Sequence, residues 1–229
     1  MADTVADQPS GVLFDVDGTL VDTPYLHAVC WGEALAQGGH DVPLATVHRA
    51  IGMGSAELLD HLLGERRDHG GDEALKTAHL TLYKQFWGRL RPLPGARDLL
   101  RKCAGRGLRV VLASSAGQEE LDALRSALAV DDAITAATSS SDARSGKPHP
   151  DILQAAMDEA GLATHRVVFV GDSIWDGKAA QRAGVLFVGL TCGGTSEAEL
   201  RAAGAVEVWR DPAELLAHWA GSGLGALLG

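Results

Sequence analysis

Short runs of apolar residues alternate along this chain with longer segments in which apolar residues recur every three or four positions. The short runs are rich in β-branched and aliphatic residues, so each predicts a buried strand, whereas the longer segments predict helices. The predicted strands cover residues 12–16, 108–114, 132–137, 166–172, 185–190 and 205–209. The predicted helices between and after them cover residues 95–105, 118–128, 150–160, 176–183, 196–203 and 212–219. Continuous apolar strands that alternate with helices are typical of a parallel sheet covered by helices on both faces.

One interval of the chain, residues 24–90, contains no predicted strand. Apolar residues recur there at helical spacing, as in "YLHAVCWGEAL" and "SAELLDHLL", and the stretch "RPLPG" at 91–95 ends the interval. We therefore predict an α/β fold, in which a Rossmann-like parallel sheet core (1–23 and 91–229) carries an inserted α-helical cap domain (24–90). The glycine-rich tail "GSGLGALLG" is expected to fray.

The composition is that of a globular protein, with 229 residues, 46% hydrophobic and 22% charged. A formal net charge of −10 argues against a nucleic acid or an anionic membrane as partner. No apolar run approaches the ~18 residues of a membrane span, and the first residues lack the pattern of a signal peptide, so we expect a cytoplasmic protein. The three cysteines show no spacing typical of a zinc site or a disulfide framework, so we interpret them as structural thiols.

Polar side chains follow three of the predicted strands at the point where each strand ends. Asp15 and Asp17 stand at the end of "VLFDV", Ser114 and Ser115 follow "VVLA", and Asp172 follows "VVFVG". In open α/β sheets, ligands bind outside the carboxyl ends of the strands. We therefore expect these side chains to converge at one edge of the sheet.

Two further charged residues fit the same edge. Lys147 lies in the loop "SGKPHPD", where a lysine can offset carboxylates and hold an anion. Asp176 comes four residues after Asp172, at the start of a predicted helix. Clustered carboxylates are costly unless a hard cation neutralises them, and Mg²⁺ is the usual partner of a few carboxylates and a substrate phosphate. The chemistry that this cluster indicates is phosphoryl transfer.

The stretches "DVDGT", "VVLASS", "GKPHPD" and "GDSIWD" occur in this order along the chain. Together they resemble the four motifs of the haloacid dehalogenase superfamily, in the phosphatase branch that includes phosphoglycolate phosphatases and β-phosphoglucomutases. The helical interval resembles the cap domain of that family, so the resemblance covers nearly the whole chain. It implies a Mg²⁺-dependent phosphatase that acts on a small phosphorylated metabolite. We expect the enzyme to be a monomer or a homodimer.

The resemblance also implies a role for each matching residue. Asp15 corresponds to the nucleophile, which forms an aspartyl-phosphate, and Asp17 to the general acid/base. Ser114 corresponds to the hydroxyl that binds the phosphoryl group, and Lys147 to the cation that orients Asp15. Asp172 corresponds to a direct metal ligand, beside the Asp15 carboxylate and the Asp17 backbone carbonyl.

Other residues are weaker candidates. Asp176 is expected to ligate the metal directly or through water, although an aspartate at a helix start is also explained by capping. The candidate substrate contacts are Gly18, Thr19, Ser115, His27 and Arg49. His27 and Arg49 are equally open to interpretation as surface residues of the helical interval.

Two other functions are weighed against hydrolysis. Mutases of this branch usually carry an arginine just after the cap glycine, whereas Gly52 is followed here by Met53, Gly54 and Ser55. Without that anchor for a second phosphate, water should be the preferred phosphoryl acceptor. A non-catalytic binding module usually lacks the nucleophile or a metal carboxylate, and both are present. A phosphatase is therefore the favoured prediction.

Overall fold

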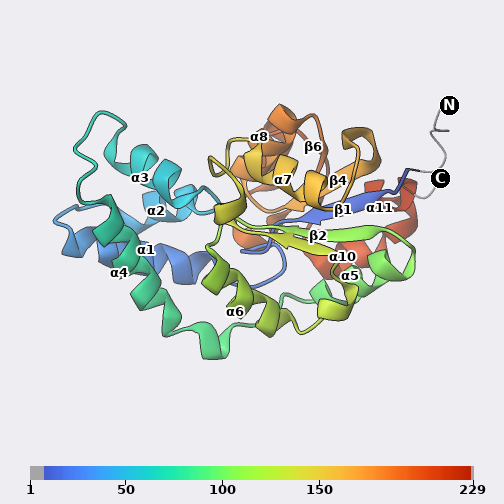
Figure 1. The fold of residues 1–229 in the computed structure, drawn as a ribbon, viewed down its shortest axis with the longest axis horizontal. Helices are drawn as coiled ribbons and strands as arrows, with labels where there is room; N and C mark the ends of the chain where they lie inside the picture. The colour runs from blue at the N-terminus through green and yellow to red at the C-terminus, as the bar shows by residue number, and fades with distance from the viewer. Residues whose placement is uncertain (1–7, 228–229) are drawn as a thin grey trace.

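The structure, a computed structural model, describes residues 8–227. Its core is one six-stranded sheet of parallel strands in the order β3-β2-β1-β4-β5-β6 (Figure 1). The strands are β1 (Gly11–Phe14), β2 (Arg109–Ala113), β3 (Ala136–Thr138), β4 (Val167–Gly171), β5 (Leu186–Leu190) and β6 (Ala205–Trp209). This is a doubly wound order, in which β1 pairs with β2 on one side and with β4 on the other. The predicted α/β fold with a Rossmann-like sheet is confirmed.

Helices cover both faces of the sheet because successive strand residues point to opposite sides. Val12 and Phe14 join one apolar cluster with α5 (Ala96–Gly105), α6 (Gln118–Leu128) and α10 (Pro212–Ala217). Leu13 joins the other cluster with α7 (Asp151–Glu159), α8 (Ile174–Ala183) and α9 (Glu197–Ala202). Figure 1 shows the two sets of helices on opposite sides of the strands.

Two predictions about local structure need correction. The third strand, predicted at 132–137, is present as β3 (Ala136–Thr138) but starts later than predicted: Asp131–Ala133 form a 3-10 helix, and the chain joins the sheet only at Thr135, whose N–H donates to Val110 O (2.8 Å). The tail was expected to fray, yet it forms α11 (Gly223–Ala226) and buries Leu224 completely in the first cluster. Within this tail, only residues 228 and 229 lie outside the described part of the chain.

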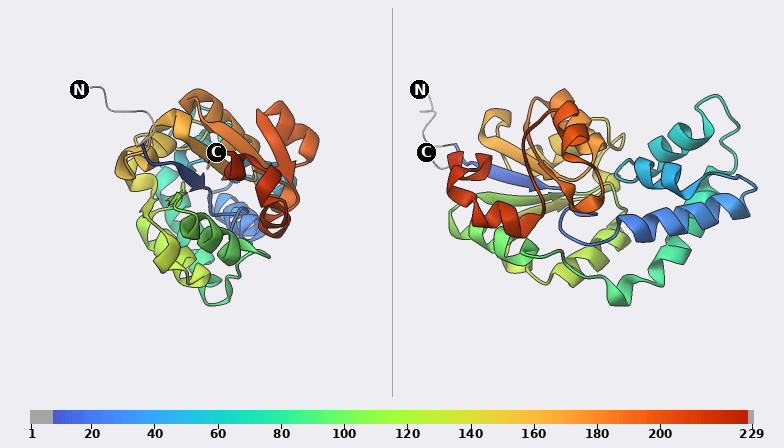
Figure 2. Two further views of the ribbon diagram at one scale, coloured as in Figure 1. Left: turned by 90° about the vertical axis from the view of Figure 1, so that its right-hand side faces the viewer. Right: turned by 180° about the vertical axis from the view of Figure 1, so that it is seen from behind.

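Four helices occupy most of the interval between β1 and α5: α1 (Pro24–Gln37), α2 (Leu44–Ala50), α3 (Ser55–Leu63) and α4 (Asp72–Lys84). They enclose an apolar cluster of their own that includes Trp31, Leu35, Leu58 and Leu59. Figures 1 and 2 show this helical segment beyond the carboxyl ends of the strands. The role of the segment as a cap domain stays a prediction. No helix within residues 8–227 has the length and apolar character that crossing a membrane requires.

Candidate active site

The chain turns sharply after β1 and brings two aspartates to the edge of the sheet. Asp15 still pairs with β4, because its N–H donates to Val170 O (2.9 Å). Gly18 then adopts a φ of +82°, and a Cβ atom there would lie 2.5 Å from Asp172 Oδ2. Only glycine meets both requirements, so the turn folds directly against the Asp172 carboxylate.

Lys147 lies between the carboxylates of Asp15 and Asp176. Its side chain is completely buried, and Nζ lies 2.5 Å from Asp15 Oδ1 and 2.8 Å from Asp176 Oδ1. Burial alone would lower the pKa of Lys147, but the two carboxylates outweigh it and raise the pKa above its usual value. Burial also raises the pKa of Asp15 to about 7, against the opposing effect of Lys147. The lysine is therefore charged and holds the Asp15 carboxylate in place.

The two carboxylate oxygens of Asp176 have different surroundings. Oδ1 faces Lys147, while Oδ2 accepts from Ser173 N (3.0 Å) and Ser173 Oγ (2.6 Å) in a capping box at the start of α8. Asp176 can therefore position Lys147, and its Oδ1, which apart from this ion pair has no hydrogen-bond partner among the described residues, is also open to a metal ion.

The fit of this site to a metal ion depends on its carboxylates. Asp15, Asp172 and Asp176 each place an oxygen within 4.8 Å of the others, and all three are buried. Burial and the charges of Asp15 and Asp176 raise the pKa of Asp172 well above its usual value, while Thr19 Oγ1 donates to Asp172 Oδ1 (2.9 Å). One lysine does not offset three carboxylates, so the oxygen ligands and excess negative charge suit a hard divalent cation.

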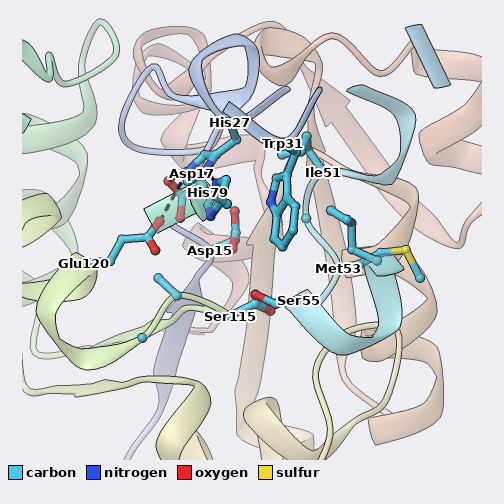
Figure 3. Close-up of a pocket in the computed structure, with 14 residues that line it drawn as sticks. Asp15, Asp17, His27, Trp31, Ile51, Met53, Ser55, His79, Ser115 and Glu120 are labelled. Atoms are coloured by element: carbon cyan, nitrogen blue, oxygen red, sulfur yellow. Dashed lines mark hydrogen bonds and ion pairs between the residues drawn. The ribbon is translucent and has the colours of Figure 1, made fainter. Parts of the chain in front are cut away.

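The Asp17 side chain points to a second cluster. Asp17 Oδ1 accepts a hydrogen bond from Thr23 Oγ1 (2.6 Å) and lies 3.2 Å from His27 Nε2. His27 Nε2 also lies 3.3 Å from Glu120 Oε1, and its Nδ1 lies 3.1 Å from His79 Nε2 (Figure 3). Burial acts to raise the pKa of Asp17, but the hydrogen bonds from His27 and Thr23 lower it overall. The predicted ligation by the Asp17 backbone carbonyl stays a prediction.

Charges in this second cluster follow from its contacts. Burial would lower the pKa of His27, but Asp17 and Glu120 raise it above its usual value. Burial and the charge of His27 hold the pKa of His79 well below its usual value. Burial raises the pKa of Glu120 to about 7. The two acidic neighbours thus favour a proton on both nitrogens of His27 over one shared with His79.

Sequence reasoning missed Glu120 and His79. A signal for both is present in the sequence. On the buried stripe of α6, Glu120 lies four residues before Leu124 and eight before Leu128. On that of α4, His79 lies four residues from both Leu75 and Tyr83. A polar residue on an apolar stripe of a helix marks a group that is buried for a reason other than packing.

The two serines after β2 have different surroundings. Ser114 is completely buried, and its Oγ accepts from Ala116 N (3.1 Å). Ser115 lines the pocket beside Asp15, and its buried Oγ has no hydrogen-bond partner among the described residues. A phosphoryl oxygen can supply that partner, so the structure makes Ser115 at least as strong a candidate as Ser114.

Other predicted substrate contacts lie elsewhere or have a different function. Arg49 does not line the pocket of Asp15; it pairs with Glu199 of α9 and lines a smaller neighbouring pocket with Asp172. The prediction of Arg49 as a substrate contact is therefore not supported by its position. Gly18 packs against the Asp172 carboxylate and Thr19 donates a hydrogen bond to it, so both residues position Asp172.

Both parts of the molecule line the pocket above Asp15 and Asp17, which contains about 510 Å³ of empty space including its mouth (Figure 3). The helical segment contributes His27, Trp31, Ile51, Gly52, Met53, Ser55, Leu58 and His79, and the core contributes Ser115, Ala116, Gly117 and Glu120. A ligand held at Asp15 would therefore contact the helical segment with its remaining atoms.

A parallel sheet with paired aspartates after its central strand and a buried lysine beside them is the arrangement of an α/β phosphotransfer enzyme. Residues 9–184 match the haloacid dehalogenase-like hydrolase family, and the chain belongs to that family. The resemblance read from the four motifs is confirmed.

Similar proteins support the same class. The chain is 31% identical over 191 residues to a phosphoglycolate phosphatase of Pseudomonas putida, which covers 81% of this chain and 70% of the relative. It is 30% identical over 223 residues to a phosphoglycolate phosphatase of Rhodospirillum rubrum, covering 93% and 91% of the two chains. A solved hydrolase from Pseudomonas syringae superposes with a TM-score of 0.88 at 32% identity, covering 93% of this chain and 98% of that one. The chain is a phosphatase of this family.

Proposed function

We propose that this protein hydrolyses a small phosphomonoester, with Asp15 as nucleophile and Mg²⁺ as cofactor. The observation that carries the proposal is the geometry around Asp15: Lys147 holds its carboxylate at 2.5 Å, and Asp17 shares the same pocket. The names of the relatives support a monoester as substrate and make phosphoglycolate the first reference compound.

The residues perform two successive displacements. A carboxylate oxygen of Asp15 attacks phosphorus, and the bond from phosphorus to the alkoxy oxygen breaks. The pKa of Asp17 is lowered in the free site, so in this proposal Asp17 takes up a proton when the substrate binds; it then gives that proton to the alkoxy oxygen, and the product leaves as a neutral alcohol. Asp17 then takes a proton from water, which attacks the aspartyl-phosphate and releases inorganic phosphate. His27 and Thr23 hold Asp17 Oδ1 throughout, leaving the second oxygen for proton transfer.

The ion would be held by the carboxylates of Asp15 and Asp172, with the Asp17 backbone carbonyl as the further predicted ligand. When bound, Mg²⁺ supplies positive charge that stabilises the phosphoryl oxygens in the transition state. Asp176 would ligate the ion directly or through water, and its ion pair with Lys147 at 2.8 Å also keeps that lysine directed at Asp15.

Residues 24–90 act in this proposal as a cap over the core formed by 1–23 and 91–229. The helical segment supplies one wall of the pocket, so its movement would admit substrate and its closure would exclude water. A small pocket beneath such a segment suits a metabolite better than a polymer.

The test is release of inorganic phosphate from p-nitrophenyl phosphate, phosphoglycolate and small sugar phosphates, with Mg²⁺ and with excess chelator. We expect Mg²⁺-dependent release that Asp15→Asn abolishes and that Asp22→Asn, an exposed aspartate of the same segment, leaves intact. Absence of phosphate from every ester in the presence of Mg²⁺ would contradict the proposed hydrolysis.

A further inference from the structure

The walls of the pocket above Asp15 carry almost no positive charge. Among the described residues that line it, none is a lysine or an arginine. Lys147, the cation nearest to Asp15, is completely buried and already paired with two carboxylates. Arg49 lines the neighbouring pocket and is paired with Glu199. An anion on the far side of a bound substrate would therefore find no free cation.

The two histidines of the pocket do not fill this gap. His27 Nε2 lies 3.2 Å from Asp17 Oδ1 and 3.3 Å from Glu120 Oε1. A positive charge on His27 is therefore already paired with two acidic groups and is not free to bind an anion. His79 Nε2 lies 3.1 Å from His27 Nδ1, where it accepts a hydrogen bond when His27 carries the proton, and the His79 ring stacks on Trp31 with ring centroids 4.2 Å apart. A nitrogen that accepts a hydrogen bond carries no proton, so His79 is neutral.

The remaining wall is mainly apolar and uncharged, apart from one carboxyl group. Trp31, Ile51 and Met53 of the helical segment line the pocket opposite the core, together with the neutral hydroxyl residue Ser55 (Figure 3). Glu120 lines it from α6 and is 8% exposed. A carboxylate or second phosphate placed here would lose its water, gain no opposite charge and lie near an acidic group, which disfavours binding.

We propose that this phosphatase selects monoesters whose leaving alcohol is uncharged and partly apolar, and discriminates against alcohols that carry a carboxylate or a second phosphate. The inference rests on the proposed function and narrows it to a substrate class. It also distinguishes this chain from relatives named for phosphoglycolate, because the alcohol released from phosphoglycolate carries a carboxylate.

The test compares three esters of similar size, namely propyl phosphate, 2-hydroxyethyl phosphate and phosphoglycolate, with p-nitrophenyl phosphate as a reference for basic competence. We expect kcat/KM for each neutral alkyl ester to exceed that for phosphoglycolate by at least ~10-fold, since an unpaired charge is expelled from an apolar site. Equal or greater kcat/KM for phosphoglycolate would overturn the inference while leaving the phosphatase assignment intact. Release from no ester, the aryl phosphate included, would overturn the proposed function and the inference with it.

Two variants test the cause of the selectivity. Ser55→Arg adds a cation to the pocket, and Glu120→Gln removes its acidic group; each should raise the ratio of kcat/KM for phosphoglycolate to that for propyl phosphate by ~10-fold. Ser126→Arg, on an exposed residue of α6 that does not line the pocket, is the matched control and should leave the ratio unchanged. An unchanged ratio in both pocket variants would contradict the charge argument.

Discussion

A buried lysine between two carboxylates sets the charge balance around Asp15. The pKa of Asp15 is raised from 3.8 to about 7, chiefly by burial. A group whose folded pKa lies above its unfolded value loses stabilising free energy as the pH rises, so ionised Asp15 weakens the metal-free fold at neutral pH and above. The nucleophile is therefore held at a cost to stability, as is common at active sites.

The first prediction follows for Asp15→Asn. The amide is nearly isosteric and can still accept from Lys147, while Asp176 keeps the lysine paired. We expect turnover to vanish and the thermal midpoint of the metal-free protein at pH 8 to be equal to or above that of the wild type. Phosphate release and thermal unfolding measure the two effects. Turnover close to the wild-type rate would assign the nucleophile to another residue.

The second prediction concerns the metal ligands. Mg²⁺ should support activity, and Ca²⁺ should inhibit it because its larger, looser coordination shell spoils the in-line geometry. Because Mg²⁺ should bind only the folded state, adding it should also raise the thermal midpoint of the wild-type protein. Asp172→Asn should remove that rise, whereas Asp60→Asn on α3 should retain it. Full activity in excess chelator would contradict the prediction.

At the scale of elements, the start of α3 is docked on the loop that carries Lys147. Glu57 Oε1 accepts from Gly146 N (2.8 Å), and Gly54 N donates to Lys147 O (3.2 Å). A Cβ atom at Gly146 would overlap with Gly54 Cα, so the two backbones meet only because both residues are glycine. The helical segment thereby contacts the backbone of the residue that orients the nucleophile.

The third prediction uses this contact. Gly146→Ala should separate α3 from the loop and lower kcat/KM by ~10-fold or more, because small displacements of a catalytic group are costly. Glu57→Ala should act in the same direction, and Glu57→Gln, which keeps an acceptor oxygen, should restore most of the rate. Gly105→Ala, where a Cβ atom meets nothing within 4 Å, is the control. Wild-type kinetics in both Gly146→Ala and Glu57→Ala would show that the contact is incidental.

Elements with strong periodicity are the ones that could be predicted from the sequence. The α6 helix was predicted at its observed bounds, because Leu121, Leu124 and Leu128 repeat on one face. Asp15, Lys147 and Asp172 converge as expected, because strand ends and one loop bring them together. Glu120 and His79 stand out locally as polar residues on apolar helix stripes, but their contact with His27 could not be predicted, because no local pattern encodes which helices meet.

For the whole molecule, the helical segment is joined to the core by two adjacent chain crossings. Asp22 N donates to Arg91 O (3.0 Å), Leu93 N donates to Leu20 O (2.9 Å), and Val21 bridges Pro92. Contacts farther out, such as Trp175 Nε1 to Arg49 O (3.0 Å), hold the segment against the core. Paired crossings of this kind are suited to a hinge.

The fourth prediction is a change in amide exchange. Saturation with Mg²⁺ and a phosphate mimic such as beryllium fluoride should slow exchange in α2 and α3, which face the core, because the closed form becomes more populated. Exchange in α10, on the far part of the core, serves as the internal reference. Unchanged exchange throughout residues 24–90 at saturation would contradict a lid role for the segment.

Because β1 lies in the middle of the sheet, the active site can form only after later parts of the chain have been synthesised. β1 is made first, yet its partners β2 and β4 are made much later in the chain. A nascent chain that ends before β4 holds Asp15 and Lys147 but lacks Asp172 and Asp176, so it has neither the full carboxylate set nor the strand that pairs with Asp15. Such a chain should be inactive and readily cleaved by protease, and both properties should change together once residues through α8 have emerged.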